Sequence, residues 1–442
     1  MFRNTYIIIL IFSGFSAFAQ ETPVEIEPQN NNTNVLNNNS MNYNGAIETE
    51  QQDTVILQKE QVKPAVKLKS GETRAARKLK KAPTRSLEAT PKAESEPNEE
   101  SELQEEISTQ DDYLMDSENA AGVQSAGYQQ ANYGFTMSQS QATHQPMQRS
   151  PLPEHQMEMD KAVNYFETNA PNSFEYHYFK YTAGNYDVSQ VEHLREAEKL
   201  MPANSDVHAQ MAAYNIITRD ADSAGVYVDK LVNSGRLNSN TLLYAEDLLI
   251  SVPENGVLIT HGFDDTYSAF QKQQEDGVRD DVTLISLDFL QSEQYRAQLE
   301  EDGFELPEQE VINVDYLAKF CELNASKPIS ISMTTPKEYF LPIKQNLYVT
   351  GLVFEYHQDT YNNFDRNNEL WNSNLSKHLI DEAVDEKSKQ LSANYLPMLL
   401  QLRKVYGQQG EIKKLKEIDD AIDKVSLQCR KYDQVQKLKS SY

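Results

Sequence analysis

The sequence predicts a small α/β module, with a parallel or mixed sheet, that is flanked by helical hairpins and preceded by a long disordered tail. Residues 253–290 give the first indication, because an apolar run, a helical pattern and a second apolar run follow one another with short links. This succession is typical of a strand–helix–strand unit whose two strands lie parallel. Apolar residues at helical spacing surround this segment, whereas the first 150 residues show neither pattern.

The first residues have the pattern of a secretory signal peptide. Arg3 gives a positive start, the run from Tyr6 to Phe12 is apolar, and Ala17-Phe18-Ala19 provides the small residues that precede a cleavage site. The apolar run is too short to span a membrane. We therefore expect residues 1–19 to be removed after Ala19 and the protein to reside in the periplasm, in a position to associate with the outer membrane.

The segment 20–150 is expected to be a disordered, low-complexity tail. Residues 30–44 are rich in Asn, and Gln, Ser and Ala dominate 124–148, so too little apolar surface is available to offset chain entropy. A basic block, Lys63–Arg85, stands before an acidic block, Glu94–Glu118. The tail is either a solvated linker or a tether whose basic block makes peripheral contact with lipid headgroups. The net charge of −26 argues against nucleic acid as a partner.

Residues 151–250 are predicted to be helical. Pro171 and the pair Gly184-Asn185 interrupt the pattern, and Pro202 precedes a new helix start at Ser205. The expected helices are 157–169, 174–183, 188–200, one from 205 onward and 237–250.

The residues around these interruptions resemble tetratricopeptide repeats. Such repeats place a small residue within a helix, a Tyr near the turn and Pro-x-Asn between units of about 34 residues. The resemblance implies a stack of antiparallel helix pairs with a concave surface for a segment of another protein. A plain helical hairpin is the alternative. The matching positions are Gly184, Tyr186, Ala197, Pro202 and Asn204, with Ala212, Tyr214 and Ala224 in the next, degenerate unit.

The α/β module is expected over 251–358 and a C-terminal helical hairpin over 359–442. Gly262 ends the first strand, and Gly277 stops the helix that follows it. Residues 347–356 form one strand, or two that bend at Gly351. The predicted strands are 257–260, 282–287, 329–333 and 347–356, and the predicted helices are 265–276, 292–301, 314–323, 392–406 and 412–429.

One loop of the module is a candidate ligand site. His261, Asp264, Asp265 and Thr266 follow the first strand, and ligands of parallel α/β sheets bind beyond the carboxyl ends of strands. His261 and the carboxylates could hold a divalent cation, or Asp265 could act as a base. The favoured alternative is that Asp264 or Asp265 caps the next helix. We predict no catalytic residue, cofactor or resident metal, because no common catalytic or metal-binding motif occurs.

Several single residues have simple structural interpretations. Cys321 and Cys429 could pair in an oxidising compartment, but their apolar helical surroundings favour two free, buried thiols. Arg279 and Asp281 are expected to form a surface ion pair. Trp371 is expected to pin a loop on a helix.

Other residues give weaker patterns. His177 and His193 are scattered and lack ligand spacing. The triplets that contain Thr54 and Ser223 resemble an acceptor for O-glycans in some Gram-negative envelopes. Glycosylation there would affect solubility and not activity.

The module also resembles the soluble C-terminal part of the bacterial protein O-mannosyltransferase-like membrane proteins. In that family a strand runs into a GDNDT-type turn, a helix and a G-x-R-x-D-V strand, and Phe263 stands here where the first Asp of the turn would be. The resemblance implies a periplasmic module attached to helical repeats. Glycosyl transfer, which the multi-pass membrane part of the family performs, is not implied. The matching residues are Gly262, Asp265, Thr266, Gly277, Arg279, Asp281 and Val282.

Export, helical repeats and a detached module together indicate an exported, non-enzymatic adaptor. We expect it to bind envelope proteins as an accessory subunit of an outer-membrane protein assembly or secretion complex, such as type IX secretion machinery. The alternative is a glycan-binding or carbohydrate-active protein, related to protein O-glycosylation, that uses the loop from His261 to Thr266.

Overall fold

The computed structural model describes residues 130–132, 135–138, 148–383 and 385–440, all within one compact unit. The predicted signal peptide, the basic block Lys63–Arg85 and Thr54 lie outside the described residues. Within the described part, no helix combines the length and the apolar character needed to cross a membrane.

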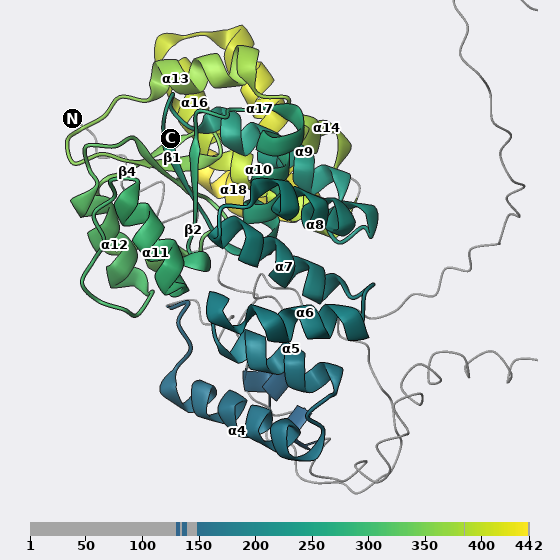
Figure 1. Cartoon of the computed structure of the whole chain (residues 1–442). Coiled ribbons are helices and arrows are strands. Elements are labelled where there is room, and N and C mark those ends of the chain that lie inside the picture. The colour runs from purple at the N-terminus through teal and green to yellow at the C-terminus, as the bar shows by residue number, and fades with distance from the viewer. Residues whose placement is uncertain (1–129, 133–134, 139–147, 384, 441–442) are drawn as a thin grey trace, which may run out of the picture. The chain divides into compact units, whose positions relative to one another are not determined.

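Six helices between residues 153 and 251 precede the sheet and confirm the helical character predicted from the sequence. Polar N-cap side chains start four of them; for example, Asn204 accepts from the amide of Asp206, and Asn238 accepts from that of Thr241. From α4 to α8 each helix lies beside the next along the stack, as Figure 1 shows. The six are α4 (Pro153–Asn169), α5 (Phe174–Ala183), α6 (Val191–Leu200), α7 (Ser205–Ile217), α8 (Ala221–Asn233) and α9 (Ser239–Ser251), with a 3₁₀ turn at Val188–Gln190 before α6.

Helix α7 takes part in two hydrophobic cores. It contributes Val207 and Met211 to a core with α4, α5 and α6 that is rich in aromatic rings. It contributes Ala213 and Ile217 to the main core, which extends over α8, α9, the sheet and the C-terminal helices. A helix that is apolar on both sides must be covered on both sides. The helical stack therefore continues into the α/β module through shared packing.

The predicted end of the disordered tail, at residue 150, is too late. Residues 130–132 and 135–138 are helical, and Phe135 is fully buried with its ring stacked on Phe179 at a centroid distance of 3.8 Å. Arg149 is buried as well. Composition does not reveal a single buried side chain of this kind, because one aromatic residue barely changes the mean hydropathy of a segment rich in Gln, Ser and Ala.

The module forms a five-stranded mixed sheet with the strand order β2-β1-β3-β5-β4. Strand β1 is parallel to β2 and β3, which confirms the predicted strand–helix–strand unit. Strand β5 runs antiparallel to β3 and β4. Residues 347–356 are two strands, and Gly351 turns between them with a φ of +55°. The strands are β1 (Val257–Thr260), β2 (Thr283–Ser286), β3 (Ile329–Ser332), β4 (Leu347–Thr350) and β5 (Val353–Tyr356).

The other helices lie between the strands or follow the last strand. Gly277, in the left-handed conformation, ends α10 as predicted. The predicted C-terminal hairpin is present, but its first helix runs through Gly407 and ends at Gly410, whose φ is +71°. The sequence does not predict the short helices on either side of this hairpin. The helices are α10 (Gly262–Asp276), α11 (Glu293–Glu301), α12 (Val314–Leu323), α13 (Phe364–Glu369), α14 (His378–Glu382), α15 (Glu386–Ser392), α16 (Leu396–Gln409), α17 (Ile412–Gln428) and α18 (Tyr432–Ser440), with 3₁₀ turns at Phe289–Gln291, Lys337–Phe340 and Ala393–Tyr395 and a π-helical turn at Leu370–Asn374.

Two predictions about single residues are confirmed. Cys321 and Cys429 are free as predicted, and Cys321 is fully buried, whereas Cys429 is only half-buried and not buried as expected. Trp371 is buried in the π-helical turn, and its Nε1 donates to Glu417 of α17 at 3.3 Å. The indole ring therefore pins this turn against the C-terminal hairpin.

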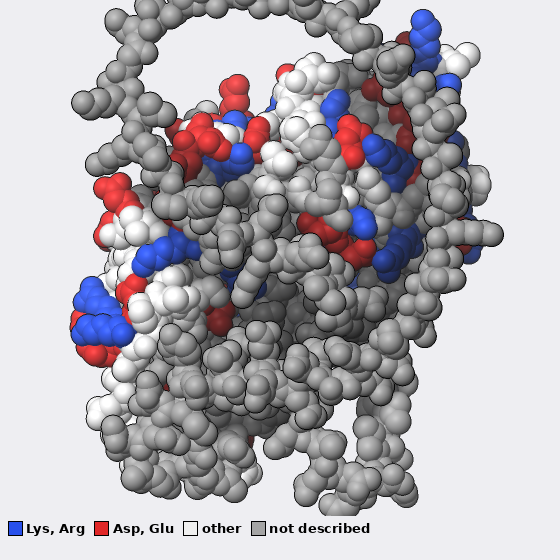
Figure 2. All heavy atoms as spheres, turned by 90° about the vertical axis from the view of Figure 1, so that its right-hand side faces the viewer, with Lys and Arg blue, Asp and Glu red and all other residues white. Residues whose placement is uncertain are grey.

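Charged side chains of both signs share the surface. In the view of Figure 2, the blue and red side chains of the described residues lie interspersed. Ion pairs within one helix contribute to this mixture, such as Lys161 with Glu158 on α4 and Arg195 with Glu192 on α6. Exposed pairs of this kind stabilise a helix by only a few tenths of a kcal/mol, about 0.3 to 0.5.

Candidate functional site

The predicted ligand loop lies at the carboxyl end of β1. His261 follows the strand directly, and α10 begins at Gly262, so Asp264 and Asp265 lie within the first turn of the helix. His261 is the N-cap residue and makes no side-chain cap hydrogen bond. The expectation that Asp264 or Asp265 is the capping residue is therefore wrong. The strand passes into the helix without a linking turn, which places both acids inside the helix.

The first amide of α10 receives its partner from another strand. Gly262 N donates to Asp288 Oδ2 at 2.7 Å, and Asp288 stands just after β2. Asp288 Oδ1 also lies 3.3 Å from Arg149 Nε. A carboxylate at a helix N-terminus interacts favourably with the aligned amide dipoles. Two other segments, the loop after β2 and the stretch that contains Arg149, thus hold the start of α10.

Asp265 is the more enclosed of the two acids, with 3% of its surface exposed. Thr334 Oγ1 donates to its Oδ2, and Ser332 supplies a further hydrogen bond from the end of β3. Burial raises the pKa of Asp265 to about 6, although both hydrogen bonds favour the charged form and lower it. A carboxyl group with this pKa can exchange a proton near neutral pH, which suits a general base as well as a buried structural acid.

Asp264 has a different partner. Lys387 of α15 places its Nζ 2.6 Å from Asp264 Oδ2. The positive charge of Lys387 also lowers the pKa of Asp265, but by less than burial raises it. Helix α15 therefore brings a cation to the loop from a distant part of the chain.

Thr266 belongs to a chain of hydroxyl groups beneath the loop. Its Oγ1 lies 2.8 Å from Thr260 Oγ1 and donates to Ser286 Oγ at 3.3 Å. Thr260 and Ser286 are the last residues of β1 and β2. All three side chains are buried. Buried hydroxyl groups that bond to one another hold these two strands and α10 in a fixed arrangement.

His261 is also buried, and it is neutral. Burial, and then the charge of Arg149, lower the pKa of His261 well below its usual value. Its Nε2 has no hydrogen-bond partner. The described residues contain no group of three or more His, Cys, Asp or Glu side chains that could hold a metal ion.

The structure thus places all four predicted loop residues among buried polar groups at the ends of β1, β2 and β3. We call this set the carboxyl-end cluster. Its ligand role stays a prediction. The cluster consists of the buried residues Thr260, His261, Asp264, Asp265, Thr266, Ser286 and Ser332, together with the half-buried Thr334.

An open cleft, which the sequence does not predict, lies near the amino end of β1. Its volume is about 690 Å³. The connection from α9 to β1 lines it with Pro253 and Glu254, and α13 lines it with Arg366 and Glu369. Glu355 of β5 also faces it. We call it the α9–α13 cleft. No local pattern predicts it, because its lining comes from separate segments.

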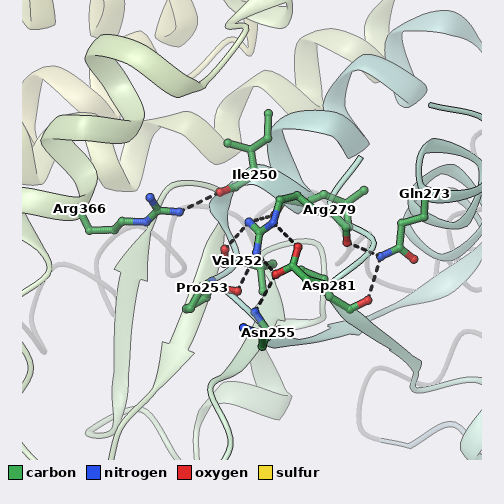
Figure 3. Close-up of polar contacts among 10 residues, drawn as sticks. Ile250, Val252, Pro253, Asn255, Gln273, Arg279, Asp281 and Arg366 are labelled. Carbon is green, nitrogen blue, oxygen red and sulfur yellow. Dashed lines mark hydrogen bonds and ion pairs between the residues drawn. The ribbon is translucent and has the colours of Figure 1, made fainter. Parts of the chain in front are cut away.

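Arg279 fixes one wall of the α9–α13 cleft, as Figure 3 shows. Its five N–H groups donate to the carboxylate of Asp281 and to the carbonyl groups of Leu249, Val252 and Pro253, at distances between 2.7 and 3.2 Å. These carbonyls lie at the C-terminal end of α9, where a helix has free acceptors. The predicted surface ion pair with Asp281 exists, but the guanidinium also closes the end of a helix.

Two further contacts hold the connection between α9 and β1. Asp281 accepts from Asn255 N at 2.7 Å, and its hydrogen bonds with Arg279 hold the pKa of Asp281 well below its usual range. Arg366 of α13 donates to Ile250 O at 3.1 Å and approaches the connection from the side opposite to Arg279 (Figure 3). The connection is therefore tied to α13 and to the loop before β2.

One pair of residues that the sequence leaves apart meets in the helical stack. His177 of α5 and His193 of α6 have their Nδ1 atoms 3.0 Å apart. Burial is the first cause that lowers the pKa of both rings. A neutral ring can donate to a second neutral ring at this distance. Spacing along one helix gives no sign of the contact, because it joins two helices.

The α/β module is similar in part to a known family. Residues 242–312, which run from α9 through α11, match the model of the TMEM260-associated domain 2. TMEM260 is a protein O-mannosyltransferase, so the match agrees loosely with the resemblance seen in the sequence. It covers less than half of the chain and includes both the predicted ligand loop and Arg279. No curated protein and no solved structure matches the chain.

Proposed function

We propose that the protein is an exported, non-enzymatic adaptor that binds envelope proteins as an accessory subunit of an outer-membrane protein assembly or secretion complex. One observation above all supports this: the helices α4–α9 form a stack that shares α7 with the main core and continues onto the sheet. Stacks of helical pairs are an architecture that offers extended surfaces to other proteins.

Two features of the sequence support a periplasmic location. The chain begins with a signal-peptide pattern, and Lys63–Arg85 is basic enough for peripheral contact with anionic lipid. Mass spectrometry of the protein from its native envelope tests the first feature. We expect the mature chain to begin at Gln20, and a mature chain that retains Met1 would contradict export.

Purification of the tagged full chain from gently solubilised envelopes tests the adaptor. We expect at least one envelope protein to be recovered in a stoichiometric amount. A second exported protein that carries the same tag controls for adhesion to the resin. Recovery of the protein alone, both before and after chemical cross-linking, would count strongly against an adaptor.

A glycan-binding or carbohydrate-active protein is the second candidate. The match of residues 242–312 favours it, because TMEM260 is a protein O-mannosyltransferase. In this alternative the segment is the soluble module of an O-mannosyltransferase-like protein, and the acids of the carboxyl-end cluster contact the glycan.

Asp264→Ala and Asp265→Ala separate the two candidates. A mannose-terminated glycan that binds the wild-type protein, and loses affinity in these variants while thermal unfolding is unchanged, would establish the glycan function. If the variants alter unfolding and no glycan binds the wild-type protein, the acids are structural and the adaptor remains.

A further inference from the structure

Glu355 is a buried carboxylate that lines the α9–α13 cleft. Its side chain is 3% exposed. Glu355 Oε2 lies 2.9 Å from His357 Nε2. Glu355 Oε1 is buried and has no hydrogen-bond partner among the described residues. A buried acceptor of this kind is unfavourable, and it gains strongly from any donor that reaches it.

Polar and aromatic side chains surround this carboxylate. Glu355 lies opposite Ser330 of β3 and Tyr348 of β4. The hydroxyl group of Ser330 is fully buried and likewise has no partner. Tyr361 stacks on His357 with a centroid distance of 3.9 Å. Burial, then the charge of Glu355 and a hydrogen bond to its carboxylate, raise the pKa of the Tyr361 hydroxyl. Aromatic rings thus frame a carboxylate that still has an unpartnered oxygen.

The charges of the cleft are not balanced within the described residues. Arg279 uses all of its N–H groups on carbonyls and on one carboxylate outside the lining. Arg366 Nη1 lies 3.7 Å from Glu369 Oε2, so these two charges form an ion pair. Neither Glu254 nor Glu355 forms an ion pair with a Lys or Arg of the described residues. The cleft therefore carries an excess of acid.

We propose that the α9–α13 cleft binds a lysine or arginine side chain of a partner protein. Glu355 is the acceptor at its floor, and the exposed acids Glu254 and Glu369 attract the cation at its rim. A charged donor forms a stronger hydrogen bond to a carboxylate than a neutral donor does. The volume of about 690 Å³ has room for such a side chain and its neighbours. The proposal rests on the adaptor function, since it names the chemistry by which a partner is held.

Calorimetric titration of the full-length protein with a short arginine-rich peptide tests the proposal. We expect the wild-type protein to bind the peptide and Glu355→Gln to bind it about tenfold more weakly, because the substitution removes a charge-assisted hydrogen bond. Glu301→Gln removes an exposed acid of α11 and should leave the affinity unchanged. The same peptide with citrulline in place of arginine is uncharged and should bind at least about tenfold more weakly.

A second variant guards against misfolding of Glu355→Gln. Glu254→Gln combined with Glu369→Gln changes only exposed side chains, so its thermal unfolding should match the wild type while its affinity falls severalfold. Equal binding of the arginine and citrulline peptides would overturn the proposal. Equal loss in Glu355→Gln and Glu301→Gln would overturn it too, because general attraction to an acidic protein would then explain binding. An acidic peptide that binds through Arg366, and is lost in Arg366→Gln, would also overturn it.

The recovery of envelope partners by the wild-type protein and by Glu355→Gln shows whether the cleft proposal or the adaptor function has failed. If Glu355→Gln recovers the same partners in the same amounts, the cleft does not hold them and only the present proposal fails. If the wild-type protein binds the peptide through Glu355 but recovers no partner, the site for a basic group stands and the adaptor function fails.

Discussion

The carboxyl-end cluster and the α9–α13 cleft belong to one sheet and treat buried carboxylates differently. In the cluster, Asp264 and Asp265 each have a polar partner and are nearly closed to solvent. In the cleft, Glu355 is equally buried and is bonded to His357, and its second oxygen is unpartnered beside open volume. A satisfied buried group mainly affects stability, whereas an unsatisfied one beside a cleft gains from binding. At the usual ligand position of parallel strands, internal hydrogen bonds hold most of the buried polar groups, although His261 Nε2 has no partner among the described residues.

Among the predicted substitutions, we expect the largest change in the free energy of unfolding at Asp265 of the carboxyl-end cluster. Asp265→Asn keeps an acceptor for Thr334 but cannot ionise. The pKa of Asp265 in the folded protein, about 6, lies above its ordinary value of 3.8, so the folded state holds the proton more tightly than the unfolded chain does. The stability from this proton is complete below about pH 4 and is lost as the pH rises through about 6.

Urea unfolding of the wild type and Asp265→Asn measures this effect. Between about pH 4 and about pH 7.5, the free energy of unfolding of the wild type should fall by about 3 kcal/mol relative to that of the variant. A difference between the two proteins that stays constant over this range would mean that the carboxyl group is open to water, and that the cluster is not closed.

Arg279→Ala tests whether the wall of the cleft depends on one guanidinium. The substitution removes the five hydrogen bonds of the guanidinium; Leu249 O, Pro253 O and Asp281 keep backbone donors, whereas the carbonyl of Val252 loses its donor. The free energy of unfolding should therefore fall by about 2 to 3 kcal/mol. Urea unfolding at neutral pH measures the loss. Arg195→Ala, which removes an exposed pair on α6, is the matched control and should cost about 0.5 kcal/mol or less. Similar losses in both variants would contradict the closing role of Arg279.

Gly351→Ala tests the packing between α9 and the turn from β4 to β5. The φ of Gly351 is +55°, and an added Cβ would stand 2.7 Å from Ser251 Cβ, so we expect a loss of about 2 kcal/mol in thermal unfolding. Gly407→Ala lies in α16 with no atom within 4 Å of the added Cβ. It should stabilise the protein by about 0.5 to 1 kcal/mol. If the two substitutions changed stability in the same direction and by the same amount, the turn would not be closely packed.

We expect the smallest change in stability for a substitution of Lys387, which tests whether this residue acts on the acids of the carboxyl-end cluster. Lys387→Gln removes the ion pair with Asp264 and should cost about 1 kcal/mol or less. It also removes a charge that lowers the pKa of Asp265, so the pH at which Asp265 loses its stabilising proton should rise. The pH profile of unfolding, compared with that of Lys387→Gln combined with Asp265→Asn, measures the shift. An unchanged midpoint would mean that Lys387 does not act on this acid.

Most of the longer helices and the strands of this protein follow from local sequence. The apolar run at 257–260, the helical spacing that follows it and the stop at Gly277 identify the strand–helix–strand unit, because strand and helix periods are properties of neighbouring residues. The helices before the sheet and the hairpin α16–α17 are predicted for the same reason. Local sequence does not predict the burial of Phe135, because a single apolar residue in a polar segment forms no repeating pattern.

The tertiary structure alone decides which side chains meet. Asp288 reaches Gly262, Lys387 reaches Asp264, and Thr334 reaches Asp265, so the predicted loop becomes part of a buried polar cluster and the expected cap is replaced. These contacts join distant parts of the chain, and spacing within one element contains no information about them. The α9–α13 cleft and the unpartnered oxygen of Glu355 depend in the same way on how α9, α13 and β5 pack. A sequence determines which groups can be buried, whereas packing determines which of them find partners.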